Sequence, residues 1–235
     1  MNDALQQTYR DCMDLGAVLS PRGERTRDLM NVQLTFSNEQ WFIDHPVLPL
    51  SWDYVKTELK WYLKGDAYDL SICDHASIWK DCVDAQGKIN SNYGQYFNAQ
   101  MGHVVDILCR DVATRRAIIN INQLEHNYLE NPDVPCTISL QFLIRNGGLH
   151  MIATMRSQDG VFGLRNDLPA FQMFKLFIAA MVGLTPGLLM INVGSWHIYE
   201  RHWEKVREAI QAPEPIVAQG GGFHSWKEFT SWLKS

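Results

Sequence analysis

Three residues in this sequence have side chains that could carry covalent and acid–base chemistry: Cys136, Glu58 and His197. A cysteine attacks carbon as its thiolate, and a nearby cation or base favours that form. A carboxylate or an imidazole can relay protons or activate water. Taken singly, each has a commoner interpretation as a buried thiol, a solvated helix carboxylate or a hydrogen-bonded polar side chain. The sequence contains no HExxH, P-loop or GxSxG motif, so the surroundings of these residues must decide.

The segment 135–172 contains the cysteine and several further polar candidates. Alternating apolar residues predict two strands joined by a hairpin at Asn146-Gly147-Gly148. Arg-Ser-Gln-Asp at 156–159 is interpreted as a turn. Apolar spacing predicts a helix over 169–182, and Asp167 could serve as its N-cap. The two predicted strands are 134–144 and 150–155.

Other predicted elements must position the remaining candidates. A helix is predicted over 49–63, with Ser51 as N-cap, Gly65 beyond its end and Glu58 beside its apolar stripe. Strands and helices follow each other without a regular βαβ alternation, which predicts an α+β fold. The further predicted strands are 30–37, 117–121 and 188–199, and the further predicted helices are 2–15, 101–114 and 200–211.

The composition favours a single domain over residues 1–235, with 46% hydrophobic and 20% charged residues. The net charge of −5 argues against binding of duplex nucleic acid, although a few clustered arginines can still hold a phosphate. The five cysteines are scattered with no CxxC pair, which predicts reduced thiols and no metal site. We find no signal peptide and no apolar run of about 20 residues, so a cytoplasmic protein without a membrane anchor is expected.

Six short segments, taken together, resemble the thymidylate synthase family and come in that family's order. The resemblance implies a thymidylate synthase-like fold, with a mixed or antiparallel sheet packed with helices and a sheet face that forms a homodimer interface. It covers roughly residues 50–205. The segments are ELKWYLKGD at 58–66, IWKD at 78–81, Arg115-Arg116, PCTISLQF at 135–142, RSQD at 156–159 and GSWHIYERH at 194–202.

Within the family, this sequence is most similar to the branch that hydroxymethylates deoxycytidylate. Asp167 stands where the synthases have asparagine. An ionised carboxylate has only acceptors, so it would repel O4 of uracil but can accept from N4–H₂ of cytosine. Buried groups left unpaired by the wrong base can discriminate by several kcal/mol. The segments that carry this likeness are GKINSNYG at 87–94, Cys136-Thr137 and VFGLRND at 161–167.

The resemblance also implies roles for individual residues. The Cys136 thiolate would add to C6 of the pyrimidine, and C5 would take the methylene of 5,10-methylenetetrahydrofolate, the co-substrate. Glu58 would then activate water and relay protons, and no metal is implied. Nucleotide contacts are implied for Arg22, Arg115, Arg116, Gln141, Arg156, Ser157, Asp167, His197 and Tyr199, and folate contacts for Trp79, Asp159 and Gly163. Arg115 and Arg116 would cross to the partner's site, so an obligate homodimer is expected.

Some alternatives stay open from the sequence. Arg25 lies as near as Arg22 to the place of the family's N-terminal phosphate arginine. The enzyme could instead methylate dCMP or dUMP, or hydroxymethylate CMP. Val83, where synthases usually have tryptophan, leaves room for water and favours hydroxylation. A non-catalytic nucleotide- or RNA-binding relative would be expected to have lost the cysteine, Glu58 or the arginines, and all are present.

Overall fold

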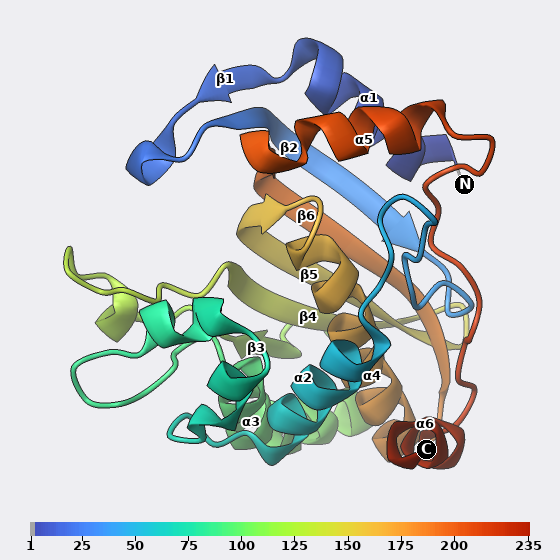
Figure 1. Cartoon of the computed structure of the whole chain (residues 1–235). Coiled ribbons are helices and arrows are strands. Elements are labelled where there is room, and N and C mark those ends of the chain that lie inside the picture. Colours follow the sequence, from blue (N-terminus) through green and yellow to red (C-terminus); the bar gives the residue numbers. More distant parts are fainter. Residues whose placement is uncertain (1–2) are drawn as a thin grey trace.

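The structure, a computed structural model, describes residues 3–235, and its six strands form one mixed sheet in the order β1-β2-β6-β5-β4-β3 (Figure 1). The strands are β1 Ala17–Leu19, β2 Thr26–Phe36, β3 Ile118–Asn120, β4 Thr137–Arg145, β5 Gly148–Asp159 and β6 Thr185–Tyr199. The helices are α1 Asp3–Leu15, α2 Trp52–Lys64, α3 Tyr93–Arg110, α4 Gly163–Val182, α5 Trp203–Gln211 and α6 Trp226–Lys234. Short 3₁₀ turns are η1 Pro21–Gly23, η2 Leu70–Asp74, η3 Ser77–Cys82, η4 Leu124–His126 and η5 Glu200–His202.

The pairing of the strands confirms the α+β prediction. Neighbouring strands run antiparallel except β5 and β6, which are parallel. Parallel neighbours need a long crossover, and α4 supplies it. The β4–β5 hairpin turns at Asn146 and Gly147, whose φ angles of 51° and 77° are those of a left-handed turn.

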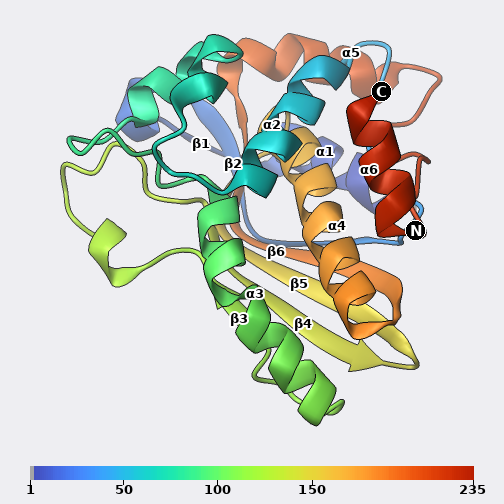
Figure 2. The same ribbon diagram turned by 90° about the horizontal axis from the view of Figure 1, so that it is seen from below.

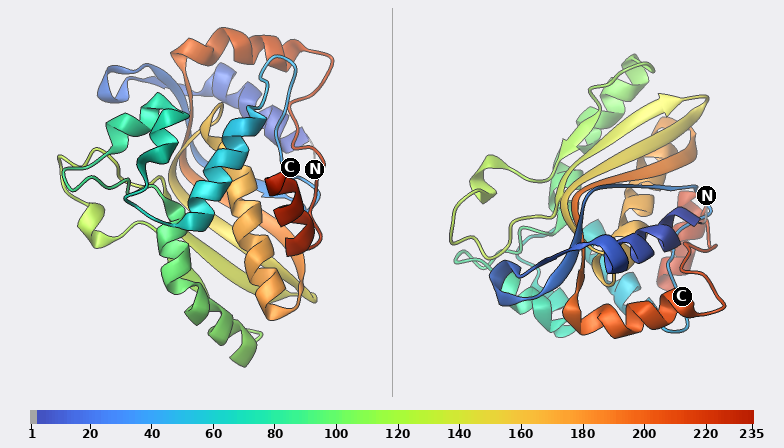
Figure 3. Two further views of the ribbon diagram at one scale, coloured as in Figure 1. Left: turned by 60° about the horizontal axis from the view of Figure 1, so that its bottom comes forward. Right: turned by 90° about the horizontal axis from the view of Figure 1, so that it is seen from above.

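Helices α2, α3 and α4 lie together against one face of the sheet (Figure 2). Stacked aromatic rings join them: Tyr62 of α2 lies 5.3 Å from Tyr93 of α3, and Phe97 of α3 lies 4.4 Å from Phe174 of α4. α6 packs beside α4, with Trp226 against Phe177 at 4.9 Å (Figure 3). Across residues 3–235, no helix combines the length and apolar character needed to cross a membrane.

The central strands change the direction of their side chains where the site lies. In β5 every second residue is buried up to Met155, and the next buried residue is Gln158. The parallel neighbour β6 changes in the same place, from Val193 to Trp196, and these residues pair across the two strands. Such an irregularity re-aims side chains beside a site. It turns Gln158 toward the helices.

Three sequence-based predictions about this region were wrong. α4 begins at Gly163, six positions before the predicted start, so Asp167 lies inside the helix and does not cap it. Pro169 cannot donate a helical hydrogen bond, but tertiary contacts hold the early turn, because Arg165 donates to the carbonyls of Leu48 and Pro49. The segment 156–159 is not a turn, since β5 runs through it. α3 spans 93–110 where 101–114 was predicted.

Candidate active site

Cys136 lies directly before β4 and is half-buried. Its carbonyl oxygen accepts a hydrogen bond of 2.9 Å from the backbone N–H of Arg156 on β5. The Arg156 side chain reaches back along the same segment, where Nε lies 3.2 Å from Pro135 O and Nη2 lies 2.6 Å from Val134 O. Arg156 therefore fixes the backbone that carries the thiol.

The Cys136 thiol has a raised pKa in the unliganded protein. Burial is the main cause, and the positive charge of Arg156 opposes it by less. Asp167 and Asp133 raise the pKa further, and Arg22 lowers it. Arg156 thus favours the thiolate, as a nearby cation should, but burial outweighs it. These interactions also put both arginines and Asp167 within electrostatic reach of the sulfur.

Glu58 points inward from α2, although a helix carboxylate is usually solvated. Its side chain is buried, and Tyr54, one helical turn earlier, donates a 2.9 Å hydrogen bond to Oε1. Trp79 Nε1 in turn donates to the Tyr54 hydroxyl at 2.8 Å. Burial, and then the charge of Asp167, raises the pKa of Glu58 to about 8. Glu58 therefore holds a proton at neutral pH.

Asp167 occupies the second turn of α4, with its carboxyl in the same interior space as Glu58. Gln158 Nε2 donates a 2.8 Å hydrogen bond to Asp167 Oδ2. Burial raises the pKa of Asp167 to about 7, although the bond from Gln158 lowers it. Both of these carboxyl groups can therefore change protonation near neutral pH.

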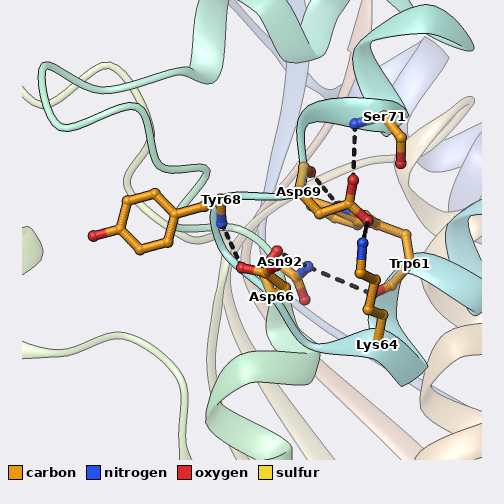
Figure 4. A network of polar contacts seen from close by, with 7 residues as sticks. All are labelled: Trp61, Lys64, Asp66, Tyr68, Asp69, Ser71 and Asn92. Carbon is orange, nitrogen blue, oxygen red and sulfur yellow. Dashed lines mark hydrogen bonds and ion pairs between the residues drawn. The ribbon is translucent and has the colours of Figure 1, made fainter.

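A polar network at the end of α2 holds Trp61, the residue that packs against Trp79, and Figure 4 shows the contacts of Trp61 in this network. The Trp61 indole donates a 2.8 Å bond to Asp69 O, and Lys64 forms a 2.8 Å ion pair with the Asp69 carboxylate. Trp61 packs against Trp79 with ring centroids 5.2 Å apart. Trp79 is thus oriented on one side by Trp61 and at its N–H by Tyr54.

Ser157, His197 and Tyr199 lie at the paired ends of β5 and β6. Ser157 Oγ and His197 Nδ1 are 3.5 Å apart, and the rings of His197 and Tyr199 meet edge to face at 5.0 Å. Burial lowers the pKa of His197, so its imidazole is neutral at pH 7. This neutral group can exchange hydrogen bonds with a sugar hydroxyl.

The two N-terminal arginine candidates differ in what they contact. Arg25 forms an ion pair with Glu200 and lies 5.4 Å from the Trp203 ring. Arg22 is exposed in η1 with a φ of 53°. Burial raises the pKa of both Cys136 and Tyr199, and the charge of Arg22 works against that rise. Of the two, Arg22 is the one whose charge acts on the cysteine.

Arg115 and Arg116 are exposed in the loop between α3 and β3. Their guanidinium groups form no ion pair with any residue in the range 3–235. Gln141 of β4 donates a 2.9 Å bond to the carbonyl of Arg115 and so fixes this loop on the sheet. These three residues form a group of their own, separate from the Cys136 group within one chain.

Asp159 and Gly163, the remaining folate candidates, shape the turn between β5 and α4. Asp159 Oδ1 accepts a 2.8 Å bond from the N–H of Val161. Gly163 is the first residue of α4, and an added Cβ would lie 2.8 Å from Gln158 Nε2. Both residues thus lie beside the Gln158–Asp167 pair.

Sequence reasoning missed two residues of this group, Tyr54 and Gln158. Tyr54 precedes Glu58 by four positions, the spacing that places two helix side chains side by side. The spacing in the sequence could therefore have predicted that Tyr54 lies beside Glu58. Gln158 lies between two candidate residues on a strand, where strict alternation would have turned it differently. The irregularity in β5 changes the direction of the Gln158 side chain, so the sequence pattern did not predict that it points into the site.

A cysteine within electrostatic reach of arginines and of an acidic side chain could attack an anionic substrate covalently. The comparison with known families identifies the family to which the chain belongs. The family model described as Thymidylate synthase matches residues 4–218. The chain therefore belongs to the thymidylate synthase family and is a folate-dependent one-carbon transferase.

Three relatives from bacteriophages carry the name Deoxycytidylate 5-hydroxymethyltransferase. The protein of Enterobacteria phage T6 is 29% identical over 193 residues, which is 74% of this chain and 78% of the relative. That of phage T2 is 31% identical over 193 residues, with the same two shares. That of phage T4 is 31% identical over 169 residues, or 64% of this chain and 68% of the relative.

Proposed function

We propose that this protein is a deoxycytidylate 5-hydroxymethyltransferase, which converts dCMP, 5,10-methylenetetrahydrofolate and water to 5-hydroxymethyl-dCMP and tetrahydrofolate. One observation carries the proposal: Asp167, the residue that the base would meet, is a carboxyl group held in a buried space beside Glu58 and near Cys136. The names of the phage relatives support it.

The base would be selected by hydrogen bonding. Ionised Asp167 offers acceptors only, so it can pair with N4–H₂ of cytosine but repels O4 of uracil. With Oδ2 bound to Gln158, the remaining oxygen is free for the exocyclic amine. Mismatched uracil would leave a buried charge unpaired, and such mismatches cost several kcal/mol.

Cys136 would supply the covalent step. Its thiolate adds to C6, and the electron pair of the C5–C6 bond moves to C5, which bonds to the methylene carbon of the folate. The C5 proton then leaves, and the C–N bond to the folate breaks to give an exocyclic methylene. The raised pKa of the free thiol means that the bound nucleotide must help to form the thiolate.

Glu58 would manage the protons around these steps. As an acid at neutral pH, it can donate toward the exocyclic group of the base. Once ionised, it can take a proton from a water molecule as the water oxygen bonds to the methylene carbon. The sulfur then leaves C6. Tyr54 and Trp79 hold this carboxyl in place.

The phosphate would be held by arginines from two chains. Arg22, Arg156 and Ser157 come from one chain, and Arg115 and Arg116 would come from the partner. The last two are exposed and form no ion pair within residues 3–235, which supports this arrangement. The sheet face opposite α2–α4 also supports it, because no helix within residues 3–235 covers β4 and β5 on that face (Figure 3). A homodimer would bury this face.

The test is mass spectrometry of the products formed from dCMP, dUMP and CMP with 5,10-methylenetetrahydrofolate. The proposal expects dCMP to gain one CH₂O, with tetrahydrofolate released and dUMP and CMP poor substrates. A gain of CH₂ with dihydrofolate formed would make the enzyme a methyltransferase. A preference for CMP would overturn the deoxyribonucleotide assignment. No product from any nucleotide would favour a binding protein.

A further inference from the structure

Gln158 is a buried amide that the chemistry above leaves without a role of its own. Its side chain is 2% exposed at the end of β5. Nε2 donates to Asp167 Oδ2 at 2.8 Å. Its carbonyl Oε1 is also buried and has no hydrogen-bond partner within residues 3–235. Burial of a carbonyl oxygen without a hydrogen-bond partner costs free energy of folding. A functional role of the Gln158–Asp167 bond would explain why the buried amide is kept at this position.

Gly163 keeps the space that this amide occupies. An added Cβ would lie 2.8 Å from Gln158 Nε2 and 3.8 Å from Asp167 Oδ2. A contact of 2.8 Å is closer than real Cβ atoms approach, so alanine here would displace the amide. The turn into α4 is thus built around the Gln158–Asp167 bond.

We propose that Gln158 is a specificity-determining positioning residue that holds Asp167 ionised, with Oδ2 occupied and Oδ1 presented to the exocyclic amine of cytosine. This inference rests on the proposed role of Asp167 in reading the base. Gln158 itself does not need to touch the base.

The protonation state of Asp167 decides what this residue can read. An ionised carboxylate accepts only and rejects uracil. A protonated carboxyl has one donor and one acceptor, like an asparagine amide, so it can pair with O4 and N3–H of uracil. Protonation therefore erases the discrimination, and the donor from Gln158 works against protonation.

A rotated amide could instead accept the proton of a neutral Asp167 through Oε1. That bond joins two neutral groups, and charge-assisted bonds are about twice as strong. The orientation in which Nε2 donates to the carboxylate is therefore the stronger one, so the net effect of the amide is to favour the ionised form of Asp167. Other groups around Asp167 act on it too, and Asp159 raises its pKa. The titratable groups that face it are Glu58, Tyr54 and Tyr62 of α2, Tyr93 of α3, Cys136 before β4 and Asp159 at the end of β5.

The direct test is a ¹³C NMR titration of the Asp167 carboxyl in the free protein, compared between the wild type and Gln158→Met. Loss of the charge-assisted bond should raise the pKa of Asp167 by about one to two pH units. Gln172→Met is the matched control, because Gln172 is an equally buried amide of α4 that bonds to Ser37 O and Gln40 O. An Asp167 pKa that is unchanged in Gln158→Met overturns the inference.

Gly163→Ala provides a second variant in case Gln158→Met does not fold. It keeps both polar residues and pushes the amide away, so the pKa of Asp167 should again rise. A pKa that stays constant in this variant also overturns the inference.

The second measurement is the ratio of kcat/KM for dCMP to that for dUMP as a function of pH. In the wild type the ratio should fall as the pH drops through about 7, where Asp167 gains a proton. In Gln158→Met the same fall should occur about one to two pH units higher, since one pKa unit is a tenfold change in protonation equilibrium. If the pKa of Asp167 rises in Gln158→Met but the ratio of kcat/KM values does not depend on pH, Asp167 does not read the base. The effect of Gln158 on the pKa of Asp167 would still hold.

Discussion

The two halves of the candidate site are built in opposite ways. The base side is defined as Tyr54, Glu58, Gln158 and Asp167. Its residues are buried or half-buried, and hydrogen bonds join them in two pairs. The phosphate side, defined as Arg22, Arg115, Arg116 and Arg156, is exposed, and none of its guanidinium groups forms an ion pair within residues 3–235. The side chains of the base side are thus held by hydrogen bonds within the protein, whereas the guanidinium groups of the phosphate side have no acidic partner within residues 3–235.

This difference fits what each side would recognise in the proposed reaction. A neutral base is read by hydrogen bonds, which discriminate strongly only where water is excluded. A phosphate is held by charge, which still acts at an exposed surface and can come from two chains. Burial carries a cost on the base side, because it holds protons on groups that would otherwise be ionised. The raised pKa values of Glu58 and Asp167 would therefore matter for the proposed reaction.

The largest expected effect lies between the two sides, at Cys136. Cys136→Ala removes the nucleophile, so turnover should fall on the order of 10⁴-fold or more. Nucleotide binding, measured by calorimetry with dCMP, should persist because both sides remain. Turnover that survives the substitution would rule out the covalent mechanism. Cys109→Ala, at an exposed cysteine, is the control and should leave turnover unchanged.

The next effect tests the base side alone. Asp167→Asn replaces an acceptor-only group by an amide, so the ratio of kcat/KM for dCMP to that for dUMP should fall by about 10²–10³-fold. The new ratio should also be independent of pH, because the amide does not titrate. Steady-state kinetics with the two nucleotides at pH 6 and 8 measures both effects. An unchanged ratio would remove Asp167 from base recognition.

The phosphate side offers a matched pair of substitutions. Arg22→Ala should raise the KM for dCMP by about 10–100-fold, since a charge-assisted contact is lost, with little change in kcat. Arg25→Ala should change the KM by about threefold or less, because Arg25 is paired with Glu200 at the surface. The reverse order of effects would make Arg25 the phosphate ligand.

The base side also shows where sequence reasoning succeeds and where it stops. Local patterns located α2 and the long strand β6 closely, and the family resemblance found Glu58 and Asp167. Burial statistics for single residues would have left Glu58 in solvent, although the four-residue spacing in α2 could have placed Tyr54 beside it. The start of α4 was missed because Pro169 normally marks a first turn, and the bonds of Arg165 to a distant loop overrule that rule. The inward direction of the Gln158 side chain results from an irregularity shared by the paired strands β5 and β6, and no local sequence pattern predicts such an irregularity.

The smallest effect concerns stability and separates the two sides by pH. The folded protein keeps a proton on Glu58 up to about pH 8, whereas the unfolded chain releases it near the ordinary value of 4.5. Between these values the folded state binds more protons, so its stability falls as the pH rises through this window. Glu58→Gln is neutral throughout and can still accept from Tyr54, so it should lose this part of the fall. Its Tm should match that of the wild type near pH 4.5 and exceed it by about 5 °C at pH 8.5, measured by calorimetry. Arg22→Ala should give no such pH-dependent difference in Tm, because that arginine is exposed and lies outside the buried group around Glu58. An equal difference in Tm at both pH values for Glu58→Gln would mean that Glu58 is ionised in the folded protein, and the acid role given to it would then be wrong.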